Sequence, residues 1–258
     1  MPDSSPSLRS SLDGGPRLVA ARWLLAVTVV GSALALGSLH TTVLCIVVAA
    51  LAVAAYLAWH DAEPFRARPA ATLLLYTGIG LTLWTLVQSI PMPASWLAVI
   101  APANADVWAR ALTPLKEPGP AWVTISLDPG ATRVQVLRGV GYLLAFLTAL
   151  RVAHRREGSI FLERTIVVSA AIMAMAALLH PAFGATKVFG VYQPVNTYAF
   201  MPNHIGPLLN LNHLVAYLNL GVCIALAGVI TSPPLMPRVL GGAFVALLVA
   251  VGLWSGSR

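Results

Sequence analysis

Seven apolar blocks divide this sequence, and they constrain its fold more than any other feature. They cover residues 23–39, 42–59, 70–87, 134–150, 160–179, 213–230 and 239–254. A helix needs about 20 apolar residues to cross the roughly 30 Å hydrocarbon layer of a bilayer. The blocks approach this length, and they lack the alternation of apolar and polar residues that the strands of a membrane barrel require. We therefore predict an all-α, polytopic transmembrane bundle of about seven helices.

The charge content agrees with a lipid environment. Only 10% of the residues are charged and 58% are hydrophobic, whereas an average soluble domain carries roughly 25% charged residues. The formal net charge is +7, but the basic residues lie in the short connections between the blocks and form no clustered patch. We therefore expect the lipid bilayer as a partner and do not expect nucleic acid.

The sequence lacks the common motifs for cofactors and metals. It contains no phosphate-binding glycine loop, no dinucleotide fingerprint and no nucleophile elbow. The two cysteines, Cys45 and Cys223, lie far apart and have no metal-binding or redox spacing. We interpret them as small, buried side chains and expect neither a cofactor nor a metal.

The chain divides into a short tail and one membrane domain. Residues 1–16 are polar and rich in Ser, Pro and Gly, which predicts a disordered cytoplasmic tail. Residues 17–258 form the predicted transmembrane domain. A signal peptide with a cleavage site at residues 33–35 is the alternative for the first block, but the second block follows almost at once and favours a transmembrane hairpin.

The distribution of Lys and Arg predicts the orientation. If the amino terminus is cytoplasmic, and Arg138 and Arg258 are left aside, ten basic residues lie on the inside and four on the outside. This bias agrees with the rule that cytoplasmic segments carry an excess of Lys and Arg. The two long connections, residues 88–131 and 180–212, then face outward. In the first, residues 91–100 predict a short helix at the membrane interface. In the second, four prolines exclude one regular helix, so we predict a structured loop.

Three arginines near outer block ends are candidates for binding. Arg138 lies about one turn inside the fourth block, and an ionisable residue at membrane depth indicates function unless its side chain snorkels to the surface. Arg133 lies close by in the sequence. Arg258 follows the seventh block and could face a phosphate, which a guanidinium binds well, or could be an ordinary terminal basic residue.

A polar cluster precedes the sixth block and comprises Asn203, His204, Asn210, Asn212 and His213. Asn210 or Asn212 could cap the helix that starts there. The free N–H groups of a helix amino terminus favour an anionic ligand, and Lys187 could add positive charge to such a site. The spacing of the histidines does not match a usual zinc site.

Three segments together resemble the O-antigen ligase and polymerase family of bacterial envelope proteins. They are residues 125–133 (ISLDPGATR), residues 206–218 (GPLLNLNHLVAYL) and residues 255–258 (SGSR). Their order and their placement at outer helix ends carry the resemblance. The second segment departs from the family pattern at Leu208, Leu211 and Ala216.

The resemblance implies a multi-pass protein of the bacterial inner membrane that transfers glycans at the periplasmic face without a metal. The donor would be a glycan on undecaprenyl diphosphate, and the acceptor would be lipid A–core or a growing glycan. Arg258 is the implied diphosphate-binding residue, with Arg133 and Arg138 in support. Asn212 and His213 would line the substrate site or be structural.

Family members usually continue into further helices and a periplasmic loop with an essential histidine. We therefore expect this chain to be an amino-terminal part, with the general base beyond residue 258 and no activity on its own. Two alternatives remain open. One is a non-catalytic partner or remnant of a polysaccharide assembly system. The other is a transporter or flippase, which the scarcity of carboxylates in the apolar blocks disfavours.

Overall fold

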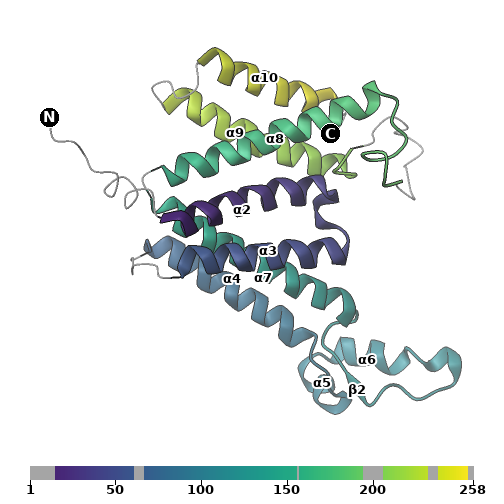
Figure 1. Ribbon diagram of the computed structural model, residues 1–258. Coiled ribbons are helices and arrows are strands. Elements are labelled where there is room, and N and C mark those ends of the chain that lie inside the picture. Colours follow the sequence, from purple (N-terminus) through teal and green to yellow (C-terminus); the bar gives the residue numbers. More distant parts are fainter. Residues whose placement is uncertain (1–14, 61–66, 156, 194–205, 232–237, 255–258) are drawn as a thin grey trace. The chain divides into compact units, whose positions relative to one another are not determined.

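The computed structural model describes residues 15–60, 67–155, 157–193, 206–231 and 238–254. Within these residues, six helices are long and apolar enough to cross a membrane. They are α2 (Gly15–Leu34), α3 (Thr41–Trp59), α4 (Pro69–Gln88), α7 (Pro129–Ala153), α8 (Gly158–Ala182) and α9 (Leu211–Thr231) (Figure 1). A shorter apolar stretch, Gly241–Leu253, lies within α10 (Arg238–Trp254). The prediction of an all-α, multi-pass membrane bundle is confirmed.

The chain forms two compact units. The larger unit contains Met1–His60 and Thr148–Arg258, and the smaller unit contains Asp61–Leu147. Helices α2, α3, α8, α9 and α10 belong to the larger unit, and α4 belongs to the smaller one. Helix α7 begins in the smaller unit and contributes its last residues to the larger one.

The first helix lies earlier in the sequence than its predicted range of 23–39. Helix α2 begins at Gly15 and ends at Leu34, and a short 3₁₀ turn, η1 (Leu36–Ser38), follows it. Leu36 and Ser38 have φ values of 58° and 59°, and this left-handed backbone cannot continue an α-helix. Residues 15 and 16 of the predicted tail are therefore helical, and residues 1–14 lie outside the described part of the chain.

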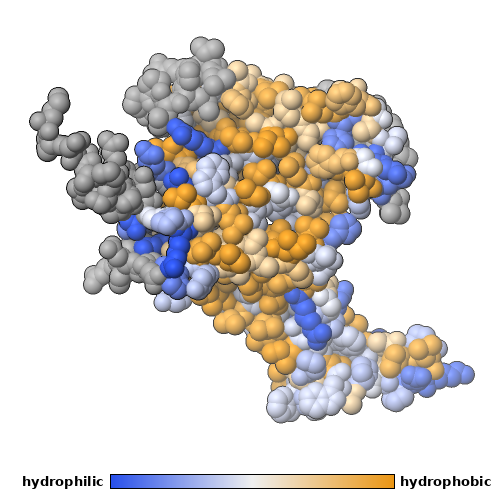
Figure 2. Space-filling model, viewed as in Figure 1, coloured by the Kyte–Doolittle hydropathy of each residue, from blue (hydrophilic) through white to orange (hydrophobic). Residues whose placement is uncertain are grey.

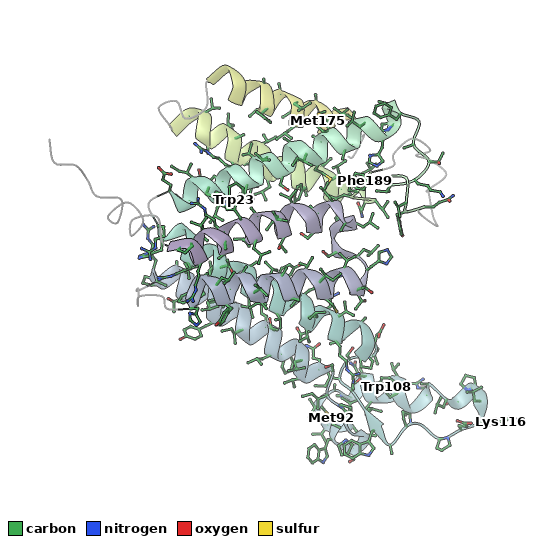
Figure 3. The ribbon with its side chains drawn as sticks, in the orientation of Figure 1. Trp23, Met92, Trp108, Lys116, Met175 and Phe189 are labelled. Atoms are coloured by element: carbon green, nitrogen blue, oxygen red, sulfur yellow. The ribbon has the colours of Figure 1, made fainter. Side chains whose placement is uncertain are left out.

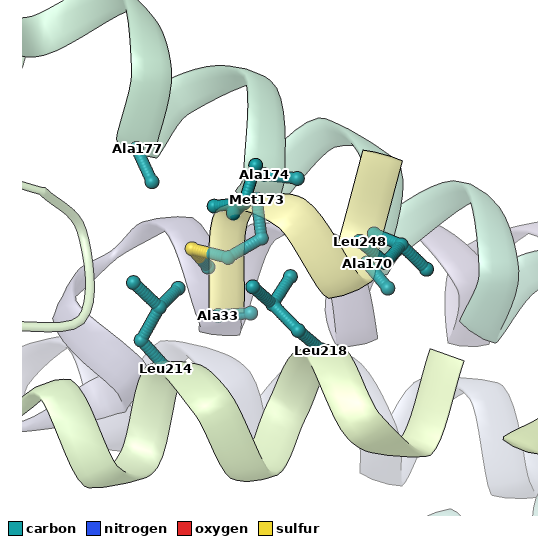
Figure 4. Close-up of a cluster of buried hydrophobic side chains, with 9 residues drawn as sticks. Ala33, Ala170, Met173, Ala174, Ala177, Leu214, Leu218 and Leu248 are labelled. Carbon is teal, nitrogen blue, oxygen red and sulfur yellow. The ribbon is translucent and has the colours of Figure 1, made fainter. Parts of the chain in front are cut away.

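Helices α2, α8, α9 and α10 share one buried apolar cluster in the larger unit (Figure 4). Its members are Ala33, Ala170, Met173, Ala174, Ala177, Leu214, Leu218, Leu248 and Val251. Small residues let membrane helices approach closely and gain dispersion contacts. Gly221 on α9 is such a position, because a Cβ atom there would lie 2.4 Å from the Cβ of Ala170. Gly221 therefore permits the close approach of α9 to α8.

The sides of the helices are mostly apolar at the surface (Figure 2). Ile46 on α3 is 65% exposed and Ile230 on α9 is 71% exposed, an arrangement that suits contact with lipid chains. Cys45 and Cys223 are also exposed, so the prediction that they are buried is wrong. Cys45 lies on α3 and Cys223 lies on α9. On a membrane helix, a small apolar side chain can face lipid as readily as protein.

The smaller unit contains a structured connection between α4 and α7. It consists of β1 (Met92–Pro93), α5 (Ala94–Ile100), α6 (Pro102–Arg110), the 3₁₀ turn η2 (Thr113–Leu115) and β2 (Trp122–Val123). Strand β1 pairs antiparallel with β2, with Met92 opposite Val123. The short helix predicted within residues 91–100 corresponds to α5.

Side-chain hydrogen bonds join this connection to the start of α7. Asn104 on α6 donates from Nδ2 to the carbonyl of Ile125 at 2.6 Å, and the indole of Trp108 donates to the carbonyl of Thr124 at 3.0 Å (Figure 3). The backbone N–H of Ala131 donates to Oδ1 of Asp128 at 2.9 Å. Asp128 thus caps α7, and Pro129 fits the first helical position.

Candidate functional site

An apolar groove of about 820 Å³ runs along the larger unit beside α2, α8 and α10. Its lining includes Leu34, Met175, Leu179, Phe183, Phe244 and Leu247. Phe189, on the loop that follows α8, also lines the groove, and Figure 3 labels it together with Met175 on α8. Ligand pockets commonly measure about 300–1,000 Å³ and are mostly apolar with a few polar groups, and this groove has those properties.

Two residues with polar side chains, His180 and Lys187, interrupt the apolar lining. His180 is only 7% exposed. Its Nδ1 atom lies 2.6 Å from the carbonyl oxygen of Ala176, and its Nε2 atom accepts a hydrogen bond of 2.9 Å from the backbone N–H of Phe189. A carbonyl only accepts and an amide N–H only donates, so Nδ1 must carry the proton and the ring must be neutral.

The hydrogen bonds of the His180 ring, together with backbone hydrogen bonds, help to fix the loop that forms one wall of the groove. The N–H of Ala185 donates to the carbonyl of His180 at 2.8 Å, and the N–H of Val188 donates to the carbonyl of Tyr192 at 2.7 Å. Val188 is 2% exposed, whereas the adjacent Lys187 is exposed. The loop therefore holds the lysine at the groove with its side chain accessible.

Replacing His180 with Ala should loosen this loop. The N–H of Phe189 would lose its acceptor, and a typical hydrogen bond contributes about 1 kcal/mol. We expect amide hydrogen exchange in residues 183–193 to become about fivefold faster, a factor that corresponds to about 1 kcal/mol. His154→Ala, in the turn between α7 and α8, is the control and should leave this peptide unchanged. Equal exchange rates in His180→Ala and the unchanged protein would contradict the role of His180.

The structure places three of the predicted site residues in the larger unit. Lys187 lines the groove. Asn212 and His213 lie in the first turn of α9, and both are exposed. The N–H of Asn212 donates to Oδ1 of Asn210 at 2.9 Å, so Asn210 is the residue that caps α9, one of the two predicted alternatives.

The predicted arginines lie elsewhere in the chain. Arg133 and Arg138 belong to the part of α7 in the smaller unit. Arg133 is exposed. Arg138 is half-buried, and its Nη1 atom donates a long hydrogen bond of 3.4 Å to Oε1 of Gln135 on the same helix. Arg258 lies outside the described residues.

The sequence reasoning missed His180. The available signal was one histidine at the end of an apolar block, directly before Pro181. A proline there favours the end of a helix, and a buried histidine must find hydrogen-bond partners nearby. The partner Phe189 follows nine residues later, and its position depends on loop geometry that the sequence does not encode in an obvious pattern.

Within the described ranges, no group of three or more His, Cys, Asp or Glu side chains is placed to hold a metal ion. Comparison with known proteins found no matching family model, no matching curated protein and no matching solved structure.

Proposed function

We propose that the chain belongs to an O-antigen ligase- or polymerase-like membrane glycosyltransferase. It would act at the periplasmic face of the bacterial inner membrane on a glycan carried by undecaprenyl diphosphate. The acceptor would be lipid A–core or a growing glycan. The observation that carries this proposal is the apolar groove with Lys187 in its lining, because the donor combines a long isoprenoid chain with a charged diphosphate.

The two parts of the donor would make different contacts. Part of the isoprenoid group would lie along apolar side chains such as Met175 and Phe183. The remainder of the isoprenoid group would stay in the bilayer. The diphosphate would lie at the rim, within reach of the Lys187 ammonium group. The Lys/Arg bias of the sequence supports an outward position for this rim, since it directs the connection between α8 and α9 away from the cytoplasm.

Positive charge at the rim would favour the chemical step. In glycosyl transfer, an acceptor hydroxyl forms a bond to the anomeric carbon while the bond from that carbon to the diphosphate oxygen breaks. The hydroxyl proton passes to a base, and undecaprenyl diphosphate leaves. Negative charge grows on the departing diphosphate, and a fixed cation nearby stabilises it.

A matched pair of lysine variants tests the groove. The sequence contains two lysines, Lys116 and Lys187, and Lys116 lies in the smaller unit outside the groove (Figure 3). We expect Lys187→Gln to weaken the binding of a polyprenyl diphosphate by about tenfold, or about 1.4 kcal/mol, and Lys116→Gln to leave it unchanged. The probe is a diphosphate with a photoreactive group in its prenyl chain, bound to the protein in nanodiscs, with labelled peptides identified by mass spectrometry.

Labelling should fall on residues 172–190 and should be weaker for the uncharged polyprenol. Equal labelling by the alcohol and the diphosphate would contradict the proposed role of Lys187. Transfer itself is measured in a ligase-deficient strain that expresses the full-length gene, through the return of lipopolysaccharide ladders. Binding without ladders would favour a non-catalytic partner or a flippase over a glycosyltransferase.

A further inference from the structure

A second, polar crevice lies at the opposite end of α8 from the groove. It measures about 250 Å³ and is lined by Arg22 of α2, Glu157, and Ile160, Phe161 and Arg164 of α8. Hydrophilic residues gather at the end of the larger unit where α2 and α8 begin (Figure 2). The crevice shares no lining residue with the groove.

The two arginines mark the boundary between a charged layer and an apolar layer. After Arg22, α2 continues to Leu34 without another Lys, Arg, Asp or Glu, and after Arg164 the same holds for α8 as far as Ala182. Because both helices are long and apolar enough to cross a membrane, these positions correspond to the interface between hydrocarbon and head groups. Phosphate groups of phospholipids lie at this depth.

The arginines lack acceptors among the described residues. Arg22 lies over the ring of Phe161, with its Cζ atom 5.3 Å from the ring centroid. Its Nε atom is buried and has no hydrogen-bond partner in the described structure. No ion pair joins Arg22 or Arg164 to another described residue. A buried donor without an acceptor is unfavourable, so an external acceptor in the crevice would stabilise the protein.

The lining is not uniformly positive. Two guanidinium groups and the carboxylate of Glu157 face one crevice, which gives it one excess positive charge. The planar donors of arginine suit the oxygens of a phosphate, whereas a carboxylate would repel a phosphate and attract an ammonium group. A ligand that carries both groups satisfies both kinds of side chain. A water molecule occupies about 30 Å³ in the liquid, so the crevice has room for a head group of several heavy atoms.

We propose that this crevice binds the head group of an amine-bearing phospholipid of the phosphoethanolamine type. Its phosphate lies between Arg22 and Arg164, and its ammonium group lies against Glu157. The acyl chains follow the apolar surfaces of α2 and α8 into the bilayer. This site is independent of the proposed glycosyl transfer, because it uses other residues at the other end of α8.

Lipid retention by the purified full chain tests the site. Native mass spectrometry compares phosphatidylethanolamine, phosphatidylglycerol and diacylglycerol, which lacks the phosphate. We expect the unchanged protein to retain phosphatidylethanolamine about tenfold better than diacylglycerol and severalfold better than phosphatidylglycerol. The double variant Arg22→Gln/Arg164→Gln should lose the advantage over diacylglycerol. Glu157→Gln should lose only the preference for the amine-bearing lipid.

Arg110→Gln is the matched control, because Arg110 lies on α6 in the smaller unit and its Nε atom donates to Asp106 at 2.8 Å. It should retain all three lipids as the unchanged protein does. If the double variant fails to fold, Arg164→Gln alone replaces it, since that side chain is exposed. A reporter fusion at the amino terminus confirms that each variant keeps its membrane orientation.

Three results would overturn the proposal. The first is full retention of phosphatidylethanolamine after loss of both arginines. The second is equal retention of phosphatidylethanolamine and phosphatidylglycerol by the unchanged protein, which would remove the role of Glu157. The third is displacement of the lipid by an equal concentration of soluble phosphoethanolamine, which would identify a soluble phosphate ester as the ligand.

Discussion

Met173→Ala should lower the free energy of unfolding by about 2 kcal/mol or more, the lower part of the range for truncating a buried methionine. Met173 is 0% exposed and lies within the cluster that joins α8 to α9 and α10 (Figure 4). In a bilayer the unfolded helices still lie in an apolar solvent, so little transfer free energy is lost. The destabilisation comes from lost dispersion contacts and from the cavity that remains.

Met175→Ala is the control for this prediction, because it removes the same atoms from the same helix. The Met175 side chain is 45% exposed and lines the open groove, so its truncation leaves no closed cavity. Unfolding in mixed micelles, followed by circular dichroism, gives both free energies. Similar losses for the two variants would show that the cluster does not determine stability.

Gly221→Ala should destabilise the larger unit by about 1–3 kcal/mol, the usual range for adding a methyl group to a tightly packed interior. The new Cβ atom would lie 2.4 Å from the Cβ of Ala170 and 3.2 Å from Cδ1 of Leu248. The Cβ of Ala170 cannot rotate away, so α8 and α9 must separate. This effect should exceed the gain of up to about 1 kcal/mol that alanine brings to a helix interior.

Gly228→Ala on the same helix separates packing from helix propensity. A Cβ atom there would have no neighbour within 4 Å, so this variant should be as stable as the unchanged protein or slightly more stable. The same mixed-micelle unfolding assay compares the two glycine variants. A stabilised Gly221→Ala protein would show that the contact between α8 and α9 is looser than the structure indicates.

The sequence predicted the helices well because the length of an apolar block and its lack of charged residues directly indicate a helix that crosses the membrane. It failed at the start of α2, because the predicted block begins at residue 23, after Arg17 and Arg22. Both lie inside α2, and the guanidinium of Arg22 packs over Phe161. An arginine side chain is long enough to bury its stem and place its charge at a distance, so a charge in the sequence does not mark the end of a helix.

The candidate site was only partly accessible to sequence reasoning. Lys187 was among the predicted residues, but the groove beside it was not predicted, because groove-lining and lipid-facing side chains belong to the same residue types. The same ambiguity explains the error at Cys45 and Cys223. The segments around Asp128 and Asn210 act locally as helix starts, because the side chain of each residue accepts a hydrogen bond from a backbone N–H of the following helix. The roles of Arg133, Arg138 and Arg258 in substrate binding stay predictions.

The exposed cysteines have a practical consequence for biophysical work. The sequence has two cysteines, both free and accessible, one on α3 and the other on α9. A thiol-reactive nitroxide would therefore attach at one site on each helix without any mutation. Double electron–electron resonance on such a sample would give the α3 to α9 spacing in native-like lipid, and ligand-dependent changes in that distance would report motion within the larger unit.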